Sequence, residues 1–290
     1  MAEITTHMFL SKDIKKIIKC NKSITLFSLG PDVFYFSKKT KKLAQIMHRK
    51  NTLLFFKNYI KYIKDNNLEN DEYIVSSLYG FLSHYVLDFK THPYIFYKGE
   101  YKLHRLYEMG LSKYIISSHN IKPNNYKSYK DLIYEKNKTI EQLLDNVIYQ
   151  TYGFNGYGKK YIKCLKRVKF TYRLFRYDKY GIKKKIYKFI DLFSKNKLSL
   201  ISFYNIKDVD LNINHNKWNH PCDKNEIYNS SLIDLYNESL NKTLEIINSV
   251  NMVLYKNKNI DTLDKVIENR SYINGKDSNT RNVMKYFEIL

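Results

Sequence analysis

The sequence predicts an all-α fold, because turn residues are rare and apolar residues recur at helical spacing. Only nine Gly and four Pro are spread over 290 residues, whereas an all-β chain needs many more turn residues. Through residues 72–88, apolar side chains recur at steps of three and four, as one face of a helix requires. We therefore expect a multi-helix bundle.

The helix expected over residues 72–88 has the clearest signals. Its apolar stripe consists of Ile74, Leu78, Phe81, Leu82 and Tyr85. Asn70 or Asp71 can cap its first turn. We expect it to end before Pro93, because a residue that precedes proline avoids the α region. A second helix is expected over residues 101–117.

Weaker apolar patterns predict the remaining helices. They cover residues 13–20, 53–64, 131–150, 160–175, 183–193 and 231–254. The polar stretch 118–130 is the best internal boundary, and residues 206–226 are expected to be irregular. No internal repeat or coiled-coil heptad is visible.

The net charge of +22 points to a nucleic acid or an anionic membrane as partner. Of the 50 basic residues, however, 43 are Lys, and the chain is also rich in Asn, Ile and Tyr. An AT-rich coding sequence supplies these four residue types, and Lys lacks the bidentate fork of Arg. The charge alone therefore does not select a partner. Separately, a content of 43% hydrophobic residues excludes a wholly disordered chain.

Localisation signals are absent from the sequence. No apolar run approaches the ~20 residues that cross a bilayer, and no basic segment followed by an apolar one opens the chain. The three cysteines, Cys20, Cys164 and Cys222, are too few for a disulfide framework. We expect a cytoplasmic protein. The basic segment 157–188 is either an amphipathic element for anionic lipid, which would make the protein peripheral to a membrane, or a core-packed helix with a solvated basic face.

Histidines gather near the start of the chain, where five of the eight lie within the first 104 residues. Two of them precede a carboxylate by four residues: His84 with Asp88, and His104 with Glu108. On a helix, such pairs lie on one face, and imidazole and carboxylate are ligands that zinc takes in catalytic sites. The spacing alone also fits ordinary surface pairs.

The residue identities and the order of these segments are more specific than the spacing of the pairs. Along the chain come Thr6-His7, Gly30-Pro31-Asp32, the run from Gly80 through His84, Asp88 and His92-Pro93, and then His104 to Glu108. This order resembles the zinc-dependent phospholipase C family, the bacterial phosphatidylcholine-hydrolysing type, and especially its shorter unexported clostridial-type relatives. The resemblance is specific over residues 5–117 and extends more weakly to residues 211–221.

The resemblance implies an all-helical fold that holds two or three zinc ions. One ion would be bound by His92, His104 and Glu108. A second would be bound by Asp32, His48, His84 and Asp88. His7, with Asp88 bridging, matches part of a third zinc site. It also implies a single domain over residues 1–290, in which residues 1–120 form the metal-site core and residues 121–290 pack around it.

Three departures from the family pattern affect this expectation. The secreted enzymes hold the third zinc with an N-terminal Trp, but the only Trp here is Trp218, so the third zinc site is weaker, differently ligated or absent. The step from Asp88 to His92 is shorter than in those enzymes, as in the unexported relatives. Ser112 replaces a family acid that is not a metal ligand.

The implied activity is that of a zinc-dependent phosphodiesterase that hydrolyses phospholipids by attack of a metal-activated water on phosphorus. Asp32 is the candidate catalytic base. Two alternatives stay open: a zinc-dependent nuclease or nucleotidase of the same fold, and a metal-binding protein without turnover. Neither a Gly-x-Ser-x-Gly motif nor a P-loop is present. The substrate is then a phospholipid or another anionic phosphodiester, and no obligate protein partner is expected.

Overall fold

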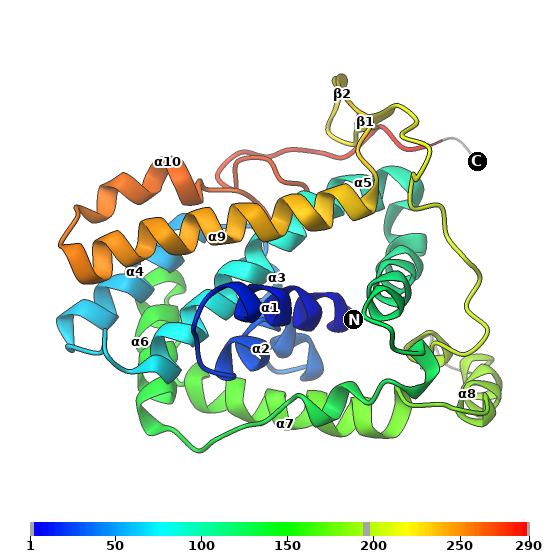
Figure 1. Cartoon of the computed structure of the whole chain (residues 1–290), viewed down its shortest axis with the longest axis horizontal. Helices are drawn as coiled ribbons and strands as arrows, with labels where there is room; N and C mark the ends of the chain where they lie inside the picture. The colour runs from blue at the N-terminus through cyan, green and yellow to red at the C-terminus, as the bar shows by residue number, and fades with distance from the viewer. Residues whose placement is uncertain (1–2, 194–197, 289–290) are drawn as a thin grey trace.

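The computed structural model describes residues 3–193 and 198–288, without the side chains of residues 100–102. The described chain is helical, which confirms the predicted all-α fold. The long helix α5 (Glu72–Ser118) runs through the centre and packs against α9 (Leu232–Lys256) on one side and α1 (Thr5–Ile17) and α2 (Ser23–Phe27) on the other. In Figure 1, α9 and α7 (Tyr157–Phe175) lie on opposite sides of α1 and α2.

The other elements complete the bundle around α5. Helices α3 (Lys41–Met47), α4 (Thr52–Asp65), α6 (Lys138–Tyr152), α8 (Ile182–Asp191) and α10 (Asp264–Ile267) are joined by the short 3-10 turns η1 (Gly30–Phe36), η2 (Pro123–Asn125), η3 (Ser128–Lys130), η4 (Leu198–Ile201) and η5 (Ile260–Leu263). None of the helices in residues 3–193 and 198–288 is long and apolar enough to cross a membrane.

The boundaries of several predicted helices are wrong, and a cap explains one case. The helix predicted over residues 131–150 begins only at Lys138, because the Asn137 side chain accepts a hydrogen bond from Ile140 N at 3.1 Å. The helix predicted over 13–20 begins at Thr5. By contrast, Asp71 caps α5 as expected, accepting from Tyr73 N and Ile74 N.

The irregular segment expected over residues 206–226 contains part of a hairpin. Strands β1 (Trp218–His220) and β2 (Asp223–Tyr228) pair antiparallel, with Trp218 opposite Tyr228. Their rings stack with centroids 4.7 Å apart, so a cross-strand aromatic pair stabilises a hairpin that the polar composition hid.

The expected end of the helix before Pro93 is also wrong, because α5 continues through it. A proline inside a helix leaves the carbonyl four residues earlier, here that of Phe89, without its usual donor and costs ~3 kcal/mol. The neighbouring residues Phe89, Tyr94 and Ile95 are buried, and this packing offsets the cost. A loop packs against the freed carbonyl: a Cβ at Gly275 would lie 2.7 Å from the Phe89 oxygen, so only glycine fits there.

The direction of α5 changes further on, between His92 and His104. In a straight helix His92 and Glu108 would be separated by ~24 Å along the axis, yet their side chains approach to 3.4 Å. A Cβ at Gly99 would lie 2.5 Å from Leu103 Cβ, where a regular helix keeps such atoms ~5–6 Å apart. The sharp bend near Gly99 turns the second half of α5 back toward the first (Figure 1).

Candidate metal centre

Three groups of donor atoms, from residues that are buried except for the half-buried His104, meet where the two halves of α5 face each other. The groups are His7 with His84 and Asp88; Asp32 with His48 and His84; and His92 with His104 and Glu108. Within each group the donor atoms lie within 4.8 Å of one another. The structure thus brings together all eight residues that the sequence resemblance selected, from α1, η1, the end of α3 and both halves of α5.

Asp88 lies at the centre of this cluster. Its Oδ1 is 3.3 Å from His7 Nε2 and 3.5 Å from His92 Nε2. Its Oδ2 is 3.2 Å from His84 Nε2 and 3.9 Å from His48 Nε2. One carboxylate therefore joins the three groups.

The outer members of the cluster approach more closely. His48 Nε2 lies 2.9 Å from Asp32 Oδ1. Glu108 Oε1 lies 2.9 Å from His104 Nε2 and 3.4 Å from His92 Nε2. The bend of α5 is needed for this last set, because it places Glu108 beside His92.

Backbone carbonyls orient three of the imidazoles. The Nδ1 atoms of His84, His48 and His92 lie 2.9, 2.6 and 2.7 Å from the carbonyl oxygens of Ser28, Ala44 and Tyr272. Because a carbonyl only accepts, each Nδ1 carries the proton and donates it. In the neutral imidazole this leaves Nε2 as a free lone pair that faces the cluster, the tautomer a metal requires.

Several buried polar atoms in the cluster lack hydrogen-bond partners among the described residues. They include His84 Nε2, Asp88 Oδ2 and Asp32 Oδ2, and each such atom costs ~1–3 kcal/mol unless something else satisfies it. The donor separations of 3.2 to 3.5 Å around Asp88 exceed the ~2.7–2.9 Å of a charged hydrogen bond. They match the ~3.3 Å between two ligands on one tetrahedral zinc with bonds of ~2.0 Å. The residues therefore fit a divalent cation such as zinc.

The charges of the cluster keep the carboxylates of Asp88 and Glu108 ionised. Burial favours the neutral acid, but the charges of His92, His84 and His7 outweigh it and hold the pKa of Asp88 well below its usual range. The same holds for Glu108: burial raises its pKa, but the charges of His104 and His92 outweigh burial, and the pKa is lowered. The ionised form is the one that binds a metal.

The pKa values of two imidazoles in the cluster shift in opposite directions. Burial lowers the pKa of His92, but Asp88 and Glu108 outweigh it and raise this pKa to about 9. Burial, and then the charge of His84, lower the pKa of His7. Without a metal, a proton held on His92 offsets part of the negative charge.

A cavity of about 300 Å³ opens onto the cluster. Besides five of the eight residues, it is lined by Tyr35, Gln45, Arg49, Phe96, Arg105 and Ile273. The two arginines were missed by the sequence reasoning. They are two of only seven Arg in the chain, and each directly follows a cluster histidine, His48 and His104, which is the signal that was available.

The N-terminal segment contacts the cluster and the second half of α5. Glu3 N donates to Glu108 Oε2 at 3.1 Å, and Ser112 Oγ lies 2.7 Å from Thr6 Oγ1. Ser112 thus joins α5 to the helix that bears His7. A small cavity of about 10 Å³ lies among Glu3, His7, Asp88 and neighbouring residues, which is about the size of a single water or ion.

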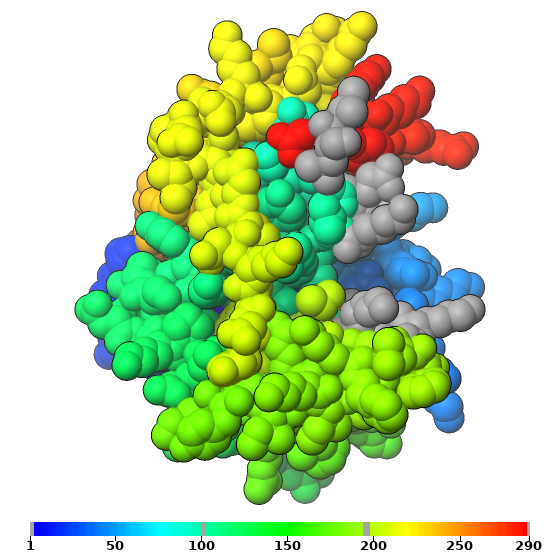
Figure 2. All heavy atoms as spheres, turned by 90° about the vertical axis from the view of Figure 1, so that its right-hand side faces the viewer, coloured from blue at the N-terminus to red at the C-terminus, as the bar shows by residue number. Residues whose placement is uncertain are grey.

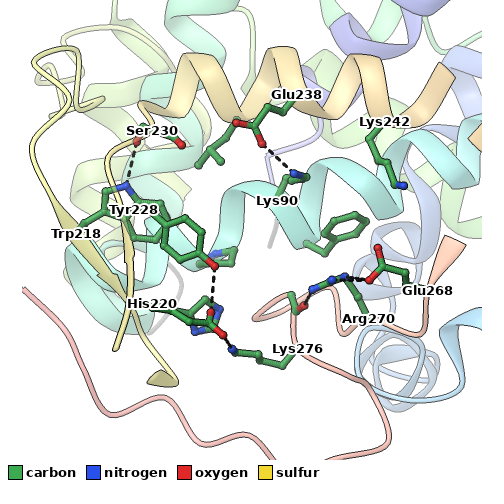
Figure 3. A pocket seen from close by; sticks show the side chains of 15 residues that line it. Lys90, Trp218, His220, Tyr228, Ser230, Glu238, Lys242, Glu268, Arg270 and Lys276 are labelled. Atoms are coloured by element: carbon green, nitrogen blue, oxygen red, sulfur yellow. Dashed lines mark hydrogen bonds and ion pairs between the residues drawn. The ribbon is translucent and has the colours of Figure 1, made fainter. Parts of the chain in front are cut away.

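The weaker resemblance around residues 211–221 does not reach the cluster. Trp218 Nε1 donates to the Ser230 carbonyl at 3.0 Å, and His220 Nε2 lies 2.9 Å from the Asn274 carbonyl. Both line a separate cavity of about 650 Å³, whose cationic side chains Lys90, Arg270 and Lys276 are paired with glutamates (Figure 3). His215 is exposed. Trp218 and His220 belong to the hairpin, and none of these three residues belongs to the donor groups.

Comparison with known proteins adds one finding. The family model described as zinc dependent phospholipase C matches residues 6–153, just over half of the 290 residues. The match covers all eight cluster residues and both arginines of the cavity. Neither a curated protein nor a solved structure matched the chain.

Proposed function

The chain belongs to the zinc-dependent phospholipase C family, and we propose that it hydrolyses phospholipids as a zinc-dependent phosphodiesterase at the cluster around Asp88. The observation that supports this most is the set of buried imidazole and carboxylate atoms that lack hydrogen-bond partners among the described residues, next to a cavity that Asp32, His92, His104 and Glu108 line. A purely structural network would satisfy those atoms with one another.

The proposed ligand sets follow the three donor groups. His92, His104 and Glu108 would hold one ion. Asp32, His48, His84 and Asp88 would hold a second. His7 and Asp88 would contribute to a third, next to the small cavity beside Glu3. Zinc bound in such a site lowers the pKa of a water and offsets the negative charge that develops on a phosphodiester.

The arginines of the cavity would bind and orient the substrate anion. A guanidinium presents a planar fork that matches two phosphate oxygens, which a Lys cannot do. Arg105 Nε is buried and has no hydrogen-bond partner among the residues described, so this donor is available to a ligand. Arg49 lines the same cavity from the other side of the cluster, next to His48.

Asp32 would hold the proton that the attacking water loses. Its Oδ1 faces His48 Nε2, whereas its Oδ2 has no hydrogen-bond partner in the described part of the chain. Because Asp32 also lines the cavity, Oδ2 can reach a water beside the phosphorus. A base in hydrogen-bond reach of its proton is the first geometric requirement of such a role.

The test combines metal analysis with parallel substrates. Purified protein should contain two or three zinc per chain, and it should release diacylglycerol and a phosphorylated head group from phospholipid vesicles. Asp88→Asn should lose at least one zinc and all activity, while the exposed Asp65→Asn keeps both. Protein that holds no zinc would refute the metal centre, and cleavage confined to single-stranded DNA would refute the lipid substrate.

A further inference from the structure

Helix α8 exposes its apolar side. Ile182, Ile186, Phe189 and Ile190 recur at three- and four-residue steps and so share one face. All four are exposed, with Phe189 at 65%, and Phe193 continues the face beyond the helix at 80%. A surface helix of a globular protein ordinarily turns this face to the core. In α8 the arrangement is inverted.

Contacts on the opposite side hold α8 in this orientation. The Asp178 carboxylate accepts from Lys183 N at 3.2 Å and Lys184 N at 2.8 Å, which fixes the first turn. In the last turn, Asp191 accepts from Leu198 N at 2.7 Å and Ser199 N at 3.0 Å.

Side chains on the same side of α8 complete its attachment. Lys184 is buried, and the ring of Tyr187 packs on Phe175 of α7 with centroids 4.8 Å apart. The polar side of α8 therefore faces the protein, and its apolar side is left without a partner in the described chain.

We propose that this face docks on an anionic phospholipid surface, which would bring the enzyme to its substrate; the inference rests on the proposed function. Lysines flank the apolar face on both edges, Lys183 on one and Lys185 on the other. Apolar side chains can enter the acyl boundary while lysines extend to the headgroups. The charge pattern and the apolar face thus match one partner, a membrane interface with negative charge.

The same charges disfavour a second copy of this chain as the occupant. A two-fold contact through α8 would bring Lys183 and Lys185 of one copy next to the same lysines of the other. Like charges in such a contact are repulsive, and the net charge of +22 adds to the repulsion.

The docking helix is connected to the metal centre by a short chain of contacts. Glu3 N donates to Glu108, and Glu3 Oε1 lies 3.7 Å from Arg176 Nη2. Arg176 follows α7, and Asp178, two residues later, caps α8. In Figure 1, α8 lies at the right-hand edge, and it faces the viewer in the lower part of Figure 2.

Vesicle co-sedimentation of the full chain tests the proposal without requiring turnover. The wild type should bind vesicles of phosphatidylcholine and phosphatidylserine in equal parts, and bind pure phosphatidylcholine less. Ile186→Glu with Phe189→Glu should lower the partition coefficient about tenfold or more, because two inserted apolar groups become charges. The matched control, Leu54→Glu with Met252→Glu, changes two exposed apolar residues on α4 and α9 and should leave partitioning unchanged.

Further readouts separate this inference from the proposed function. The α8 variant should keep its zinc content, its melting temperature and its rate on a soluble short-chain phosphodiester, and lose rate only on vesicles. Unchanged partitioning in the α8 variant would overturn the docking proposal while leaving the activity intact. A wild-type dimer that this variant converts to a monomer would also overturn it, since a second copy would then cover the face. Absence of phospholipid turnover with normal vesicle binding would refute the proposed function alone.

Discussion

Gly30→Ala tests whether the cluster depends on the position of one imidazole. Gly30 has a φ of +48°, and a Cβ there would lie 2.5 Å from His84 Cγ. The closest ordinary contact for a Cβ is ~3.4–4 Å, so the ring must move by ~1 Å. Metal–ligand distances tolerate only ~0.2 Å. We therefore expect zinc affinity to fall by ~10–100-fold, as for other changes that misplace a ligand, although no ligand atom is removed.

Gly153→Ala is the matched control for this substitution. Gly153 has a φ of +73°, and a Cβ there meets nothing within 4 Å. Both variants should lose ~1–2 kcal/mol of unfolding free energy, because each forces alanine into the left-handed region, and Gly30→Ala should lose a further ~1–3 kcal/mol through overpacking. Urea unfolding and chelator competition measure the two quantities. Equal zinc affinity in the two variants would refute the reasoning.

Three further predictions concern the charges and contacts of the cluster. Removal of zinc with a chelator should lower the melting temperature by several degrees, because buried carboxylates such as Asp88 lose their counter-charge; an unchanged scanning calorimetry trace would contradict this. The increase in melting temperature caused by zinc should grow as the pH rises from about 6.5 to about 9. The pKa of metal-free His92 is raised to about 9, so below that pH His92 must release a proton before it binds zinc. An increase in melting temperature that does not depend on pH would contradict this. In the metal-free protein the raised pKa of His92 contributes stability below pH ~6.5 that is lost as the pH rises through about 9. The lowered pKa of Glu108 has the opposite pH dependence: it contributes stability above pH ~4.5 that is lost as the pH falls. Ser112→Ala should cost ~1 kcal/mol in urea unfolding, because Thr6 Oγ1 loses its partner, whereas an unaltered unfolding midpoint would show that this contact is not needed.

The two histidine–carboxylate pairs could be predicted from the sequence because each pair is local. His84 with Asp88, and His104 with Glu108, need only a helix to share a face, and the structure has that helix. What joins the two pairs is not local. The bend near Gly99 depends on packing between segments far apart in the sequence. The sequence rule applied here predicted a helix end before Pro93, and it did not predict a bend at Gly99.

The orientation of α8 shows the same limit. Its periodicity predicted an amphipathic helix, and a periodic pattern does not say which face is buried. That choice is made by Asp178 and Asp191, which bind backbone groups on the polar side. The two halves of the segment 157–188 therefore differ. In α7, Tyr161, Leu165 and other apolar residues pack into the core, as expected for a core-packed helix with a solvated basic face. In α8, the apolar face is turned outward.

Anomalous X-ray diffraction at the zinc edge, from crystals of the zinc-loaded protein, tests the central claim most directly. We expect peaks on both sides of Asp88, one about 2.0–2.1 Å from the Nε2 atoms of His92 and His104 and another at the same distance from His48 and His84. The absence of anomalous density at these positions, with Asp88 instead in direct hydrogen bonds to the histidines, would contradict the account.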